Sequence, residues 1–144
     1  MPFSWDKSLA TGSSTIDQQH QRLFAQVAAL GDAMKQGKGR QEINTILDFL
    51  GRYVVQHFDE EEKLMEETDC PAAAANKQAH TRLLSSYGEL RKRFDGAGAG
   101  PALTLEIYEV LSKWLVGHIK GVDVQLRNYI CQPNQGFVGA ANES

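Results

Sequence analysis

Apolar residues recur at three- and four-residue steps in four long stretches of the chain, and this period is typical of amphipathic helices. The stretches cover residues 14–36, 40–67, 71–94 and about 101–130. Gly37-Lys38-Gly39 follows the first stretch, Pro71 suits the first position of the third helix, and the glycine-rich residues 96–100 precede the fourth. No strand pattern competes. The sequence predicts an all-α protein, and the short links favour an antiparallel up-down-up-down four-helix bundle.

The length of the chain predicts a single domain with two flanking segments. Its 144 residues, 42% of them hydrophobic, suffice for one compact core. We expect the bundle to occupy residues 1–131 and to include an N-terminal arm whose aromatics, Phe3 and Trp5, pack on the bundle ends. Residues 132–144 have little apolar content and are interpreted as a flexible tail or linker.

Composition indicates which kinds of partner and which cellular compartment to expect. The 15 basic and 18 acidic residues are scattered, without the basic stripe that neutralises phosphates, so nucleic acid is not an expected partner. The apolar runs are far shorter than the roughly 20 residues that cross a bilayer, and no signal-peptide pattern opens the chain. We therefore expect a cytoplasmic protein without a membrane partner. Cys70 and Cys131 match no disulfide, zinc or redox pattern and are expected to be reduced thiols.

Each of the four predicted helices carries one of the four histidines, namely His20, His57, His80 and His118. Glu61 follows His57 by four residues, so both side chains project from one face of the same helix and can bind one metal ion.

Asp123 has a less direct relation to its histidine. It follows His118 by five residues, which places it about 140° around a regular helix, so the two share a site only if the aspartate reaches across as a bridging carboxylate does. Imidazole and carboxylate ligands in a bundle favour iron or manganese over zinc. Four imidazoles and two carboxylates exceed the capacity of one octahedral ion, so two metals are predicted.

A simpler interpretation competes at each position. A single histidine on an amphipathic helix is more often a surface or core residue than a ligand, and His20 or His80 alone would be assigned that way. The other acidic residues of the second helix are interpreted as a solvated face. These are Glu60, Glu62, Glu66 and Glu67.

Several segments together resemble the bacterial hemerythrins, from Trp5 to about Tyr129. The resembling pieces are IDQQHQRL at residues 16–23, HFDEEEKLM at 57–65, Pro71 ahead of KQAH at 77–80, and WLVGHIKGVD at 114–123. The fold that the resemblance implies is the same four-helix bundle.

The resemblance also implies a cofactor and a ligand set. Two iron ions joined by an oxo or hydroxo bridge would be expected, one held by His20 and His57 and the other by His80 and His118. Glu61 and Asp123 would bridge them, and dioxygen would bind at an open position of the first iron. The wall of the ligand pocket would be apolar, excluding water. The matching residues are Ile16, Leu23, Phe58, Trp114, Leu115 and Ile119.

One position departs from the family pattern. The family usually has His-x-x-x-His on the third helix, whereas this chain has Asn76 four residues before His80. The asparagine offers a weak amide ligand, holds a ligating water or leaves the position vacant, so the second iron would have two imidazoles rather than three. Cys70 stands where the family often has tyrosine and is interpreted as structural, with a redox role as the alternative.

Three functions are consistent with these features. The first is binding or sensing of dioxygen or a related small ligand, with a linked or partner signalling domain in the case of sensing. The second is a di-iron enzyme of the peroxidase type or a reductase of dioxygen or nitric oxide. The third is a metal-poor interaction or iron-storage module.

Overall fold

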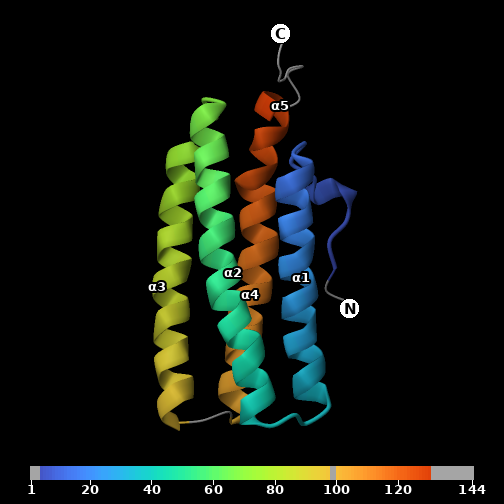
Figure 1. Cartoon of the computed structure of the whole chain (residues 1–144), viewed down its shortest axis with the longest axis vertical. Helices are drawn as coiled ribbons and strands as arrows, with labels where there is room; N and C mark the ends of the chain where they lie inside the picture. The colour runs from blue at the N-terminus through green and yellow to red at the C-terminus, as the bar shows by residue number, and fades with distance from the viewer. Residues whose placement is uncertain (1–3, 98–99, 131–144) are drawn as a thin grey trace.

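Four long helices form an antiparallel bundle in the computed structural model, which describes residues 4–97 and 100–130. They are α1 (Ser14–Lys35), α2 (Arg40–Glu67), α3 (Ala73–Ala97) and α4 (Pro101–Gly121). Three short elements flank them: the 3-10 helices η1 (Lys7–Leu9) and η2 (Asp123–Leu126), and α5 (Arg127–Ile130). Successive helices run in opposite directions (Figure 1), which confirms the predicted all-α up-down-up-down topology.

Each long helix packs against two neighbours around one core. α1 contacts α2 and α4, and α3 contacts the same two helices from the opposite side. The core between them is built from apolar side chains of all four helices, including Leu30, Leu47, Phe94 and Ile107, which are at most 1% exposed. No helix within the described residues is both long and apolar enough to cross a membrane.

A side-chain cap and a glycine turn fix the two ends of α1. The Ser13 hydroxyl oxygen accepts a hydrogen bond from the Ile16 amide, which caps the N-terminus of α1. At the other end Gly37 has a φ of +66°, a left-handed conformation that glycine adopts without strain, and the Lys38 amide donates back to the Ala33 carbonyl. The predicted range 14–36 is therefore confirmed to within one residue.

Three predicted boundaries are wrong. α3 continues to Ala97 rather than ending at residue 94. α3 begins at Ala73 rather than at Pro71, because the Ala73 amide bonds to the Cys70 carbonyl in a tight turn before the α-helical pattern starts. The fourth helix does not run on to residue 130. α4 ends at Gly121, and Val122, with φ −122° and ψ −57°, separates it from η2 and α5.

The topology gathers the histidines at one end of the bundle. His20 and His80 lie near the beginnings of α1 and α3, whereas His57 and His118 lie near the ends of α2 and α4. Because successive helices are antiparallel, these four positions share the end of the bundle that is uppermost in Figure 1.

The N-terminal arm is tied to that same end. The Thr11 amide and hydroxyl donate to one carboxylate oxygen of Asp17, at 2.8 and 2.9 Å. The Arg127 guanidinium donates twice to the Ala10 carbonyl, at 2.7 and 3.0 Å. Half-buried Trp5 packs on the core, as predicted. Phe3, Cys131 and the predicted tail lie outside the described residues.

Burial in the core predicts a large cost for shortening a core side chain. Leu30 is fully buried, so Leu30→Ala is expected to lower the free energy of unfolding by about 2–5 kcal/mol. The matched control is Leu105→Ala, because Leu105 is 46% exposed and its truncation should change stability by no more than about 0.5 kcal/mol. Urea unfolding of both variants measures the difference, and equal stabilities would contradict the assignment of the core.

Candidate metal centre

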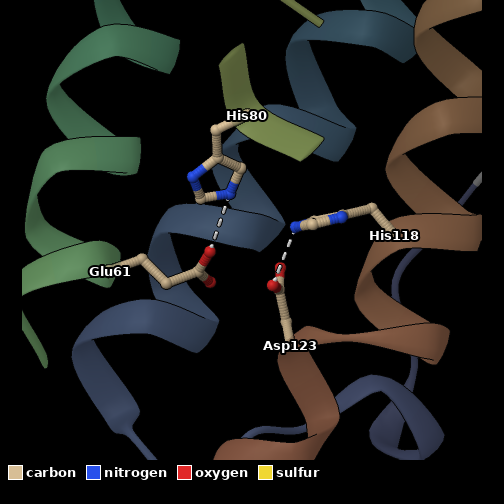
Figure 2. A group of neighbouring side chains, drawn as sticks. All are labelled: Glu61, His80, His118 and Asp123. Carbon is tan, nitrogen blue, oxygen red and sulfur yellow. Dashed lines mark ion pairs between the residues drawn. The ribbon is translucent and has the colours of Figure 1, made fainter. Parts of the chain in front are cut away.

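Four imidazoles and two carboxylates meet in the interior at the histidine end of the bundle. All six side chains are buried, from 0% exposure for His20 and Glu61 to 7% for His118. They form two groups, and the ligand atoms within each group lie within 4.8 Å of one another. One group contains Glu61, His80, His118 and Asp123, which point toward one another in Figure 2. The other contains His20, His57 and Glu61, so Glu61 belongs to both.

Each carboxylate directs its two oxygens to different halves of this cluster. Glu61 places Oε1 3.1 Å from Nε2 of His80 and Oε2 3.1 Å from Nε2 of His20, while Nε2 of His57 lies 3.7 Å from the same Oε2. Asp123 places Oδ1 3.0 Å from Nε2 of His118 and Oδ2 3.2 Å from Nε2 of His20. The two carboxylates thus connect the halves, an arrangement suited to bridging a pair of ions.

The break after α4 explains how Asp123 reaches the cluster. On a continuous α-helix, Asp123 would lie about 140° away from His118. Instead the Val122 amide makes the last hydrogen bond, to the His118 carbonyl at 2.8 Å, and the chain turns into the 3-10 helix η2, of which Asp123 is the first residue. Leaving the α-helix there brings the carboxylate beside His118 (Figure 2).

Two histidines are held by hydrogen bonds on their outward-facing nitrogens. Nδ1 of His57 donates to the amide oxygen of Gln19 at 2.6 Å, and Nδ1 of His80 donates to Oε2 of Glu62 at 2.9 Å. Both partners accept, so both Nδ1 atoms carry the proton and both Nε2 atoms turn a lone pair into the cluster. Neutral imidazole fixed in this way is the form that binds metals.

The acidic residues beside Glu61 are not all solvated as predicted. Glu66 and Glu67 are exposed, in agreement with the prediction, but the Glu62 side chain is only 21% exposed and contacts His80. Glu60 accepts a hydrogen bond from Gln19 at 2.9 Å. The prediction was wrong for Glu62 because the partner histidine lies on another helix. Gln19 and Glu62 directly adjoin His20 and Glu61 in sequence, which was the available signal.

Charge in the buried cluster is balanced by protons when no cation is bound. Burial disfavours the charged form of His20, but hydrogen bonds with Asp123 and Glu61 outweigh it and raise the pKa of His20 to about 9. Burial and the nearby Asp123 act to raise the pKa of Glu61, yet the hydrogen bond from His20 helps to hold it below its ordinary value. The pKa of Asp123 is also lowered, since hydrogen bonds from His118 and His20 outweigh its burial. The carboxylates therefore stay ionised and attract positive charge.

Burial has the opposite outcome for His57, which belongs to the same group of donors as His20. It lowers the pKa of His57 to about 3, outweighing the attraction of Glu61. His57 is therefore neutral and ready to bind a cation at neutral pH without losing a proton.

Asn76 lies inside the half of the cluster formed by His80 and His118. It is fully buried, and its amide faces two imidazole nitrogens and two carboxylate oxygens. With its nitrogen turned toward them, it lies 2.7 Å from Nε2 of His118, 2.9 Å from Nε2 of His80, 3.0 Å from Oδ1 of Asp123 and 3.2 Å from Oε1 of Glu61. The residue that departs from the family pattern thus faces the proposed ligands directly, and a half-turn of the amide would present its oxygen to a cation instead.

Apolar residues enclose the cluster. Phe58 stacks on His80 with ring centroids 3.6 Å apart, and Trp114 stacks on His118 at 4.4 Å. A small apolar cavity of about 20 Å³ adjoins them, lined also by Leu23 and Leu115. The other predicted pocket residues, Ile16 and Ile119, are buried but do not line this cavity.

Cys70 lies apart from the ligand atoms. It is a free, buried thiol that packs with Met65, Ala72 and Leu126.

The donor set fits a pair of metal ions. Six inward-facing nitrogen and oxygen donors converge, two imidazoles have their lone pairs fixed toward the interior, and two carboxylates span both halves. Imidazole with carboxylate, in the absence of thiolate, suits iron or manganese.

Comparison with known proteins assigns the chain to a family. Residues 11–126 match the model of the hemerythrin HHE cation binding domain, and the chain belongs to the hemerythrin family. It is 35% identical to a bacteriohemerythrin of Stenotrophomonas maltophilia over 119 residues, which cover 83% of this chain and 75% of that protein. It is 30% identical to a hemerythrin-like protein of Naegleria gruberi over 90% of this chain and 94% of that one. The resemblance seen in the sequence is thereby confirmed.

Solved structures agree with this assignment. A crystal structure of wild-type hemerythrin superposes with a TM-score of 0.78 at 31% identity, covering 88% of this chain and 95% of that chain. The family is one of di-iron, oxygen-binding proteins, and the buried His/Glu/Asp cluster of this chain is in keeping with it.

The geometry of the cluster predicts different roles for two adjacent glutamates. Glu61→Gln should abolish binding of a metal pair, because the carboxylate shared by both groups would become a neutral amide. The matched control is Glu60→Gln, which should keep two metals per chain because Glu60 contacts Gln19 and Gln56 rather than the cluster. Metal analysis of the purified variants measures this, and equal losses would show that the wrong glutamate has been placed at the centre.

Proposed function

We propose that this chain is a non-haem di-iron protein that binds dioxygen, or a related small ligand, at a carboxylate-bridged site. The observation that carries the proposal is the convergence of six buried donors in which each carboxylate spans both halves. A single ion could not use all six donors together with an exogenous ligand, whereas two ions could.

The proposal assigns the ligands residue by residue. His20 and His57 would hold one iron, His80 and His118 the other, and Glu61 and Asp123 would bridge them. The pair of irons would supply the two electrons that reversible binding of dioxygen requires. Asn76 adds an amide to the His80–His118 half alone, so the open position for a small ligand is assigned to the His20–His57 half.

The surrounding residues would protect and orient this site. Phe58 and Trp114 cover His80 and His118 with aromatic rings, and Leu23 and Leu115 extend the apolar lining. Apart from the indole N–H of Trp114, these side chains have no group that hydrogen-bonds water or anions, so a small apolar ligand is favoured. Gln19 and Glu62 fix the imidazoles of His57 and His80 with their Nε2 atoms facing inward.

Two physiological uses are consistent with such a site. One is oxygen binding by a free-standing protein, and the other is oxygen or redox sensing, which requires a linked or partner signalling domain. For sensing, a change at the metal site could reach the N-terminal arm through Arg127. This residue lies four positions after Asp123 and donates to the Ala10 and Ser8 carbonyls.

Asn76 favours a second candidate function, a di-iron enzyme of the peroxidase type or a reductase of dioxygen or nitric oxide. An amide is a weaker ligand than the imidazole that the family usually has at this position, so a second exchangeable position becomes available. Multiple turnover with peroxide and a reductant would support the enzyme. The third alternative, a metal-poor interaction or iron-storage module, has less support, because all six donors are present and buried.

The proposal predicts both a metal content and a response to air. Protein purified and reduced without oxygen should contain two irons per chain, and admission of air should produce new absorption bands that fade when oxygen is removed. Manganese-loaded protein serves as the control for bands that need iron. One metal or none, with no change in the ultraviolet-visible spectrum, would refute the proposal and support the interaction or storage module.

A further inference from the structure

The two halves of the cluster differ in the charge of their outer hydrogen-bond partners. The partner of His57 is the neutral amide of Gln19, whereas the partner of His80 is the carboxylate of Glu62. His80 also shares its half of the cluster with Asn76, whose amide lies 2.9 Å from Nε2 of His80. The anionic outer partner therefore occurs in the half that has an amide where the family usually has an imidazole.

A carboxylate hydrogen-bonded to Nδ1 of a histidine changes the strength of Nε2 as a metal ligand. Its hydrogen bond to Nδ1–H increases the electron density of the ring and makes Nε2 a stronger donor to a cation. An amide oxygen donates less strongly than a neutral imidazole does. The effect of Glu62 thus has the sign needed to offset the weaker ligand at Asn76.

The placement of Glu62 also restricts the orientation of His80. Glu62 comes from α2 and contacts the edge of the imidazole, while Phe58, one turn earlier on α2, stacks on its face with an interplanar angle of 3°. These two contacts direct Nε2 toward Oε1 of Glu61 at 3.1 Å. The imidazole is therefore preorganised from the neighbouring helix rather than from α3 itself.

We propose that Glu62 is a positioning residue that strengthens His80 as a metal ligand and compensates for Asn76 in the same half of the site. This inference rests on the proposed di-iron function. It goes beyond that function in assigning a specific role to a residue that is not itself a ligand.

Anaerobic calorimetric titration of the metal-free chain with Fe²⁺ tests the role of Glu62. Glu62→Gln keeps the shape of the side chain and removes its charge, so it should weaken one of the two metal equivalents by about 10- to 100-fold and leave the other unchanged. Gln19→Ala should weaken the opposite equivalent, since Gln19 contacts His57. A merely structural role for Glu62 would weaken both equivalents together.

A double-mutant cycle isolates the compensation. In an Asn76→His background the half regains its third imidazole, so Glu62→Gln should cost less affinity there than in the natural chain. Glu66→Gln is the matched control, because Glu66 is an exposed glutamate of the same helix one turn further on. Circular dichroism of each variant verifies that the helices are retained.

The outcomes separate this inference from the function on which it rests. Two equivalents bound by the natural chain, with Glu62→Gln indistinguishable from Glu66→Gln, would overturn the role of Glu62 alone. An equal loss in both backgrounds, within about twofold, would overturn the compensation. Fewer than two equivalents bound by the natural chain would overturn the proposed function and this inference with it.

Discussion

Two carboxylates buried at one end of the bundle require positive charge beside them, and the arrangement of that end follows from this requirement. Glu61 and Asp123 are at most 1% exposed, and an unpaired charge in such a place costs several kcal/mol. Imidazoles from all four helices surround them, and His20 faces an oxygen of each carboxylate. Without a cation, a proton on His20 balances part of the charge, so cation binding and proton loss are coupled.

Such a polar interior is sustainable because the stability of the fold comes from elsewhere. The remainder of the bundle is an apolar core, mainly of leucine, isoleucine, valine and phenylalanine, contributed by all four helices. At the histidine end, Arg127 also joins the segment after Asp123 to the N-terminal arm, and Asp17 anchors Thr11 of that arm. Helix packing thus positions donors whose own burial is unfavourable until they are paired.

The sequence predicted the helices and the histidine cluster well, because both depend on periodic, local signals. The apolar period located α1 and α2 almost to the residue. The histidines lie early in α1 and α3 and late in α2 and α4, which in an antiparallel bundle places all four at one end. The prediction from sequence failed where a helix boundary depends on irregular backbone. Nothing in the pattern marked Val122 as the break that lets Asp123 reach His118, and Glu62 was assigned to solvent because its partner lies on another helix.

Asn76 makes the two halves of the site respond differently to a cation. In the metal-free cluster its amide nitrogen faces two imidazole nitrogens and two carboxylate oxygens, and its two N–H groups can donate to two of them. A cation there must displace those hydrogen bonds and turn the amide, whereas the other half must release the proton of His20. A histidine at position 76 would bring its own lone pair and have no such preference for the empty state. The asparagine therefore acts on the metal-free protein as well as on the ligand set, and so does Glu62, whose carboxylate accepts a hydrogen bond from His80 without a cation.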